Sequence, residues 1–169
     1  MQILTIATLS IAAALAIAAP AQAQTQTVMT DASFADMRTA AESLESVFVG
    51  ESKADADAPY IEMKSPDGLH YVFYGLECTG AGAAKRCSGI NLSLTFNLKS
   101  DAAAEEAAGL IDYAALSDYT EGKDLNLTRY LILDGGITAA NLSANVEVFT
   151  RLGNKAWDLL TEEGLFPDS

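Results

Sequence analysis

Enzymatic chemistry needs a nucleophile with a base, a pair of acids, or a metal ion with an open position, and this chain has few residues of those kinds. Its single histidine, His70, lies in an aromatic stretch, where a histidine is more often packed or at a sheet edge than a base. The sequence contains no Gly-x-Ser-x-Gly motif and no second histidine for a His-Glu-x-x-His site. We therefore predict no catalytic residue and expect that the protein is not an enzyme.

The acidic residues do not form a recognisable metal site either. Asp55 and Asp57 are close enough to be considered as a calcium ligand pair, but no third acid and no glycine follow at EF-hand spacing. Glu105 and Glu106 are neighbours on an expected helix, where adjacent side chains point in different directions. We expect no metal and no cofactor, and a small hydrolase that uses His70 or the Asp55–Asp57 loop is kept only as an alternative.

Two cysteines, Cys78 and Cys87, lie at the feet of two expected strands and bracket a loop rich in glycine and alanine. A metal site would need two further ligands, and redox enzymes use a much closer Cys-x-x-Cys pair at a helix N-terminus. Strand feet across a short loop bring two Cα atoms to bridging distance. The sequence therefore predicts a structural disulfide and an oxidising compartment. A closed loop of this size would add roughly 2–3 kcal/mol to the free energy of unfolding.

The cysteine loop also carries Lys85 and Arg86, a basic spot near the centre of the predicted fold. Two interpretations stay open for these cations: they meet an acidic ligand, or they are solvated at the loop tip. Gly80 and Gly82 beside them do not form a phosphate-binding loop, because no strand-to-helix junction follows.

The start of the chain is typical of a secretory signal peptide. Residues 1–23 contain no charged side chain, Ile3 to Ala19 is an apolar run, and Pro20 ends it before Ala21-Gln22-Ala23. These features predict a signal peptide with cleavage after Ala23 and a periplasmic or secreted location. No Lys or Arg precedes the apolar run, and its length leaves an uncleaved membrane anchor as the alternative.

Length and charge limit the class of protein. Cleavage would leave 169 − 23 = 146 residues, enough for one domain with a hydrophobic core. The net charge of −13 lies entirely in that part and repels both phosphate backbones and anionic lipid. We expect no nucleic-acid partner and no membrane contact after cleavage.

Hydrophobic periodicity predicts the elements that carry these residues. Residues 24–30 are expected to be a loose terminus, and 31–165 to form the domain. Thr30 or Asp31 is a candidate N-cap of the first helix, and Thr138 of the last. Apolar residues three and four apart predict helices, and strict alternation such as Ile90 to Leu98 predicts strands. The expected helices cover 31–45, 101–115 and 139–163, and the expected strands cover 47–49, 60–64, 69–75, 88–98 and 125–133, with a loop at 116–124.

These elements predict an α+β fold in which three helices flank an antiparallel sheet of about four to five strands. The last helix has more apolar surface than packing against one sheet requires. We therefore predict a candidate protein-binding face on it, formed by Val148, Leu152, Trp157 and Leu160. The alternative is that these four side chains belong to the core.

The sequence resembles the YbjN-type domain family, often described as sensory transduction regulators. The resemblance is carried by Tyr60-Ile61, Tyr71-Val72-Phe73-Tyr74-Gly75, Cys78 and Cys87, Ile90 to Phe96, and the Gly135-Gly136-Ile137-Thr138 turn before a helix with Asn141-Leu142, Phe149 and Trp157. It implies a fold like that of the type III secretion chaperones, and a functional surface that binds a protein or forms a dimer.

The sequence as a whole predicts a non-enzymatic bacterial protein that is exported and acts by protein–protein binding, with another protein or a second copy of itself. The first alternative is a periplasmic carrier of a small ligand, with the aromatic strand Tyr71–Tyr74 lining its pocket. The hydrolase is the second.

Overall fold

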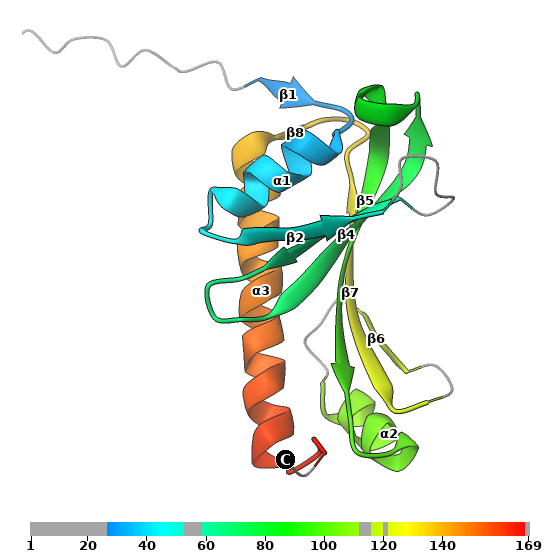
Figure 1. Ribbon diagram of the computed structural model, residues 1–169, viewed down its shortest axis with the longest axis vertical. Helices are drawn as coiled ribbons and strands as arrows, with labels where there is room; N and C mark the ends of the chain where they lie inside the picture. Colours follow the sequence, from blue (N-terminus) through cyan, green and yellow to red (C-terminus); the bar gives the residue numbers. More distant parts are fainter. Residues whose placement is uncertain (1–26, 53–58, 112–115, 120–121, 168–169) are drawn as a thin grey trace, which may run out of the picture.

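A computed structural model describes residues 27–52, 59–111, 116–119 and 122–167 (Figure 1). The predicted signal peptide, residues 1–23, lies outside these ranges, as do Asp55 and Asp57. In the part of the chain that is described, no helix combines the length and the apolarity needed to cross a membrane.

An antiparallel sheet forms the centre of the molecule, in the strand order β2-β3-β4-β5-β7-β6. Its strands are β2 (Val47–Glu51), β3 (Tyr60–Lys64), β4 (His70–Thr79), β5 (Arg86–Asn97), β6 (Leu116–Tyr119) and β7 (Asp124–Ile132). Strands β3, β4 and β5 are consecutive hairpin partners, as the sequence predicts. A separate two-stranded ribbon pairs β1 (Val28–Met29) with β8 (Ile137–Thr138).

Three α-helices complete the described fold, which is therefore α+β as predicted. They are α1 (Phe34–Glu42), α2 (Asp101–Leu110) and α3 (Ala139–Glu162). Figure 1 shows α3 running the length of the molecule, with α1 across its first turns and α2 at the far end, below β6 and β7. A short 3-10 helix, η1 (Gly82–Ala84), lies in the loop between β4 and β5.

The core lies between α1, α3 and one face of the sheet, which we call the inner face. On β5 the side chains of Ile90, Leu92, Leu94 and Phe96 are buried, while Thr95 and Asn97 are exposed. This is the alternation that predicted the strand. The buried stripe of α3 faces the same core and consists of Leu142, Val146, Phe149, Gly153, Ala156 and Leu160.

Helix α3 approaches the sheet most closely at Gly153. A Cβ atom at this position would lie 2.6 Å from Leu94 Cδ2 and 3.1 Å from Leu69 Cδ1. Both distances are too short for an ordinary van der Waals contact. The absence of a side chain on Gly153 therefore sets the separation of α3 and β5.

The first helix is capped differently from the prediction. Ser33, and not Thr30 or Asp31, is the N-cap: the Asp36 N–H donates to Ser33 Oγ at 3.2 Å, and the Ser33 N–H donates to Asp36 Oδ2 at 2.9 Å. This capping box satisfies two amides at the start of the helix. Thr138 is the N-cap of α3, as predicted, and Ser100 is the N-cap of α2.

Two other segments differ from the prediction. Residues 28 and 29, expected to be part of a loose terminus, form β1, and residues 116–119, expected in a loop, form the edge strand β6. The main sheet therefore has one strand more than the upper expected number. Both segments are too short to show periodicity, and tertiary pairing makes them strands.

The predicted disulfide is present between Cys78 and Cys87, which face each other directly across β4 and β5 with their Cα atoms 3.9 Å apart. Gly75 lies against it, because a Cβ there would be 2.5 Å from Cys87 Sγ and 2.8 Å from Cys78 Sγ. The ring of Phe34, at the start of α1, is also close to this point. The disulfide thus joins the hairpin beneath the first turn of α1.

Candidate functional site

The four residues of the predicted binding face on α3 do not form one surface. Leu160 is completely buried in the core, and Val148 and Leu152 are half-buried. Trp157 is 47% exposed but lies about half a turn around the helix from Val148, at 3.6 residues per turn. The buried stripe separates the two flanks, so they cannot contact one partner surface together.

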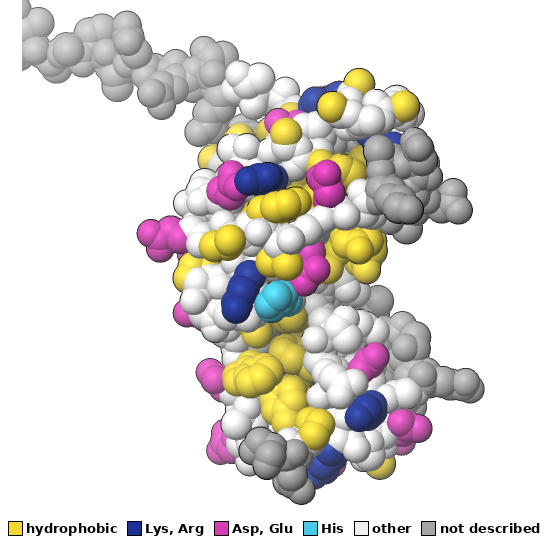
Figure 2. All heavy atoms as spheres, in the orientation of Figure 1, with side chains coloured by type: hydrophobic (Ala, Val, Ile, Leu, Met, Phe, Trp, Pro, Cys, Tyr) yellow, Lys and Arg dark blue, Asp and Glu magenta, His cyan; other side chains and the backbone are white. Residues whose placement is uncertain are grey.

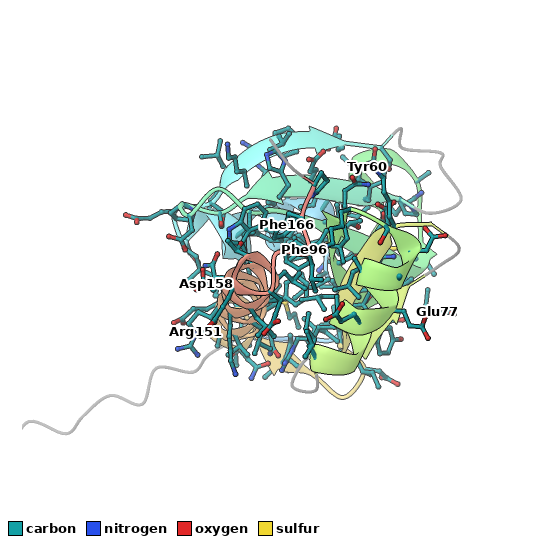
Figure 3. All side chains as sticks on the ribbon, turned by 90° about the horizontal axis from the view of Figure 1, so that it is seen from below. Tyr60, Glu77, Phe96, Arg151, Asp158 and Phe166 are labelled. Atoms are coloured by element: carbon teal, nitrogen blue, oxygen red, sulfur yellow. A yellow bond between two sulfur atoms is a disulfide. The ribbon has the colours of Figure 1, made fainter. Side chains whose placement is uncertain are left out.

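Trp157 instead belongs to an aromatic cluster at the C-terminal end of α3. Its ring centre lies 4.5 Å from that of Phe166 and 6.2 Å from that of Phe96. Figure 3 shows Phe96 and Phe166 together between α3 and the sheet, with Arg151 and Asp158 pointing away from them. Phe166, which follows α3, folds back onto Trp157 and Phe96, and the cluster closes one end of the core.

The opposite face of the sheet, which we call the outer face, is not covered by any described element. Its side chains on β3, β4, β5 and β7 are all partly or fully exposed. The strand register brings Tyr60, Tyr74, Asn91 and Tyr130 into one row across these four strands. The rings of Tyr60 and Tyr74 are in contact, with centroids 5.8 Å apart. Tyr130 is 54% exposed.

Apolar side chains extend this row into a patch. Ile132 is 64% exposed and lies opposite Gly89 on β5. A Cβ on Gly89 would be 2.8 Å from the Tyr130 hydroxyl oxygen, so the tyrosine side chain lies over the bare backbone of the glycine. We call the following set the outer patch: Tyr60, Val72, Tyr74, Leu76, Tyr130 and Ile132.

His70 also lies on the outer face, and Figure 2 shows the histidine at the surface. Its Nδ1 is 2.8 Å from Glu62 Oε1 on the neighbouring strand. The His70 side chain is exposed and that of Glu62 is partly exposed, so screening by solvent weakens this contact. Among the described residues no group of three or more His, Cys, Asp or Glu side chains is arranged to hold a metal ion.

Arg86 and Lys85, the two cations of the cysteine loop, have different surroundings. Arg86 Nε donates to Asp31 Oδ1, its Nη2 donates to the Asp31 carbonyl oxygen at 3.2 Å, and Nη2 lies 3.4 Å from Asp36 Oδ2. Beside this cluster, Ala32 and Cys87 exchange two backbone hydrogen bonds of 2.9 Å. The acidic partner of Arg86 is therefore the protein's own N-terminal segment.

The same cluster affects Asp36. Partial burial raises the pKa of this carboxyl, but hydrogen bonds from the Ser33 N–H and hydroxyl and the Arg86 charge outweigh it, and the net pKa is lowered. Folding therefore favours the ionised form of Asp36 over its protonated form.

Lys85 lines a pocket of about 340 Å³ between α1, β2 and η1, which we call the α1–β2 pocket. Its described lining is Phe34, Ala35, Arg38, Phe48, Glu51, Ser52, Ile61, Gly82, Ala83 and Lys85. The Arg38 guanidinium lies 4.4 Å from the centre of the Phe48 ring and pairs with Glu42 at 2.7 Å. Apart from Lys85, nothing in the sequence indicates this pocket, because its walls come from four separate segments: α1, β2, β3 and the loop that contains η1.

The aromatic strand expected to line a ligand pocket does not line this one. Tyr71 and Phe73 are buried on the inner face with ring centres 5.7 Å apart, while Val72 and Tyr74 point to the outer face. The Tyr71 hydroxyl donates to Ser46 Oγ at 2.8 Å. Burial raises the pKa of Tyr71, and the Ser46 hydrogen bond offsets part of this increase. Tyr71 is therefore a neutral core residue.

Comparison with known proteins adds no assignment: no family model matches the sequence, and no curated protein and no solved structure matches the chain.

Proposed function

We propose that this protein is exported, has no catalytic activity, and acts by binding another protein through the outer patch. The observation that carries the proposal is the row of three tyrosines on a sheet face that no described element covers. The proposed partner surface therefore lies on the sheet and not on α3, where the sequence predicts it.

The composition of the outer patch supports a protein partner. Tyrosine combines a rigid apolar ring with a polar tip and is enriched at protein interfaces, while lysine and glutamate are depleted there. The outer patch consists of three tyrosines and three aliphatic residues, and the carboxylate beside it, Glu62 opposite Val72, pairs with His70. On a chain that carries −13, an area with so few charged side chains is one that a partner can approach with little repulsion.

Export is supported by two independent features. The apolar run before Ala23 is typical of a signal peptide, and the Cys78–Cys87 disulfide is the kind of bond that persists in the periplasm or outside the cell. A protein-binding module is also what the resemblance to YbjN-type domains implies, so membership of that family is part of the same proposal.

The test is affinity capture of the mature protein from its own periplasm, comparing two double variants. Tyr130→Ser with Ile132→Ser removes the centre of the outer patch. Val47→Ser with Val49→Ser is the matched control, because these side chains, 65% and 46% exposed, lie on β2 outside the patch. We expect the captured partner to be lost from the first variant and retained by the second.

Light scattering on the purified protein separates a second copy from a different partner. A dimer that the Tyr130 and Ile132 substitutions convert to a monomer identifies the outer patch as a homodimer interface. A strict monomer with no co-purifying protein would contradict the proposal, and so would equal loss of the partner from both double variants.

A further inference from the structure

We propose that the α1–β2 pocket binds a small amphipathic carboxylate, a medium-chain acid in size, at a site separate from the outer patch. The pocket's volume of about 340 Å³ is within the range of small-molecule sites, roughly 300–1,000 Å³. The inference goes beyond the proposed function and does not depend on it.

The walls of the pocket are suited to an apolar body. Phe34 and Ala35 come from α1, Phe48 from β2, and Ile61 from β3, where its side chain is buried in the core. Ala83 of η1 contributes on the other side. These side chains have no polar atoms, so an alkyl chain or ring placed among them leaves water without losing hydrogen bonds.

Three polar groups of the lining indicate the charge of the ligand. Arg38 and Lys85 come from different segments, and each contributes one positive charge. Arg38 pairs with Glu42 through its Nε–H, which leaves the other donors of the guanidinium fork for a ligand. Ser52 Oγ accepts the Tyr60 N–H at 2.9 Å, so its own hydroxyl proton is left to donate.

A single carboxylate fits these groups better than other charged groups. A planar carboxylate accepts from an arginine fork and a hydroxyl at the same time. Glu51, which also lines the pocket, opposes a doubly charged phosphate, and the two cations oppose an ammonium group. A neutral apolar ligand would make no hydrogen bond to these donors, which are partly or fully exposed and would stay hydrated.

The experiment is isothermal titration calorimetry of the mature, disulfide-closed protein with octanoate, 1-octanol and octylamine. The three probes share one apolar body and differ in the head group. We expect octanoate to bind at least about tenfold more tightly than 1-octanol, since hydrogen bonds to charged groups are the stronger ones. Octylamine is expected not to bind.

Variants locate the site. Ala35→Trp fills the pocket from α1 and Ala83→Trp fills it from η1, and each should abolish octanoate binding. Arg38→Met and Lys85→Met keep the side-chain length without the charge, and each should weaken octanoate about tenfold while leaving 1-octanol unchanged. Arg151→Met, on the outer side of α3, is the charge control and should bind octanoate as the unsubstituted protein does.

Three results would overturn the proposal: no octanoate binding, equal affinity for octanoate and 1-octanol, or octanoate binding that survives both tryptophan substitutions. Circular dichroism confirms that each variant is folded. The two tryptophan positions lie on different elements, so a folding defect in one leaves the other as a test.

Discussion

Arg86 holds the N-terminal segment against the foot of the β4–β5 hairpin. It contacts Asp31 through a side-chain and a backbone oxygen and lies beside the Asp36 carboxylate, which also closes the capping box of α1. One guanidinium thereby connects the segment before α1, the first turn of α1 and β5. Each contact is largely exposed and adds little stability by itself, so the stabilising effect depends on the contacts acting together.

The lowered pKa of Asp36 predicts a pH-dependent effect of Asp36→Asn. Because the folded pKa is lower than the unfolded one, the carboxylate stabilises the fold above the unfolded pKa, and this stabilisation is lost as the pH falls through the folded pKa. We expect the substitution to cost about 1 kcal/mol at pH 7 and progressively less below about pH 4. Urea unfolding at a series of pH values measures this.

The control for Asp36→Asn is Asp101→Asn, an exposed acid in the first turn of α2. It shares the position near a helix N-terminus but has no arginine partner among its described contacts. Equal costs for both substitutions at every pH would show that the cluster around Arg86 contributes nothing of its own.

At the scale of elements, α3 packs closely on the sheet because Gly153 has no side chain. Gly153 lies in the middle of a long helix, a position where glycine normally reduces stability. The close approach of Leu94 and Leu69 explains why it is tolerated. The close contact of helix and sheet offsets the weaker helix propensity.

The same substitution, glycine to alanine, at two helix positions tests this explanation. Gly153→Ala should destabilise the protein by about 1–3 kcal/mol, because the added methyl group overlaps Leu94. Gly109→Ala in α2 should stabilise it by about 0.5–1 kcal/mol, since nothing lies within 4 Å of a Cβ there. Chemical denaturation measures both, and a gain from both substitutions would mean that α3 moves away from the sheet without cost.

The sequence predicts the long elements well, because each contains several periods of its own pattern. Strand β5 alternates from Ile90 to Asn97 and α3 repeats its apolar stripe over several turns, so the sequence predicts both to within a few residues. The disulfide was predictable because both cysteines lie on one hairpin. Strands β1, β6 and β8 contain too few residues for a pattern, and pairing determines them: β1 and β8 are distant in sequence, and β6 pairs with the next strand, β7.

The candidate sites were less predictable than the fold. The outer patch depends on the register that places Tyr60, Tyr74 and Tyr130 in one row, and residues far apart in sequence meet there. The α1–β2 pocket depends on where a loop lies against a helix. On α3, apolar content alone suggested one face, whereas the helical angle between Val148 and Trp157 places them on opposite flanks.

At the scale of the whole molecule, export predicts a definite covalent form. The protein recovered from the periplasm or the medium should begin at Gln24 and lack two hydrogen atoms relative to the reduced chain. Intact-mass analysis before and after reduction measures both. A full-length chain in the membrane fraction would support the uncleaved anchor instead, and two free thiols in the exported protein would contradict an oxidising location.

The pairing of β1 with β8 determines the order in which the molecule can be completed. Val28 and Met29 pair with Thr138 and Ile137, so β1 stays unpaired until β8 has been synthesised. Contacts between positions so distant in sequence form slowly. A newly synthesised chain therefore leaves Val28 and Met29 unpaired until residues 137 and 138 have been made, whereas Asp31 and Ala32 just after them find their partners, Arg86 and Cys87, much earlier.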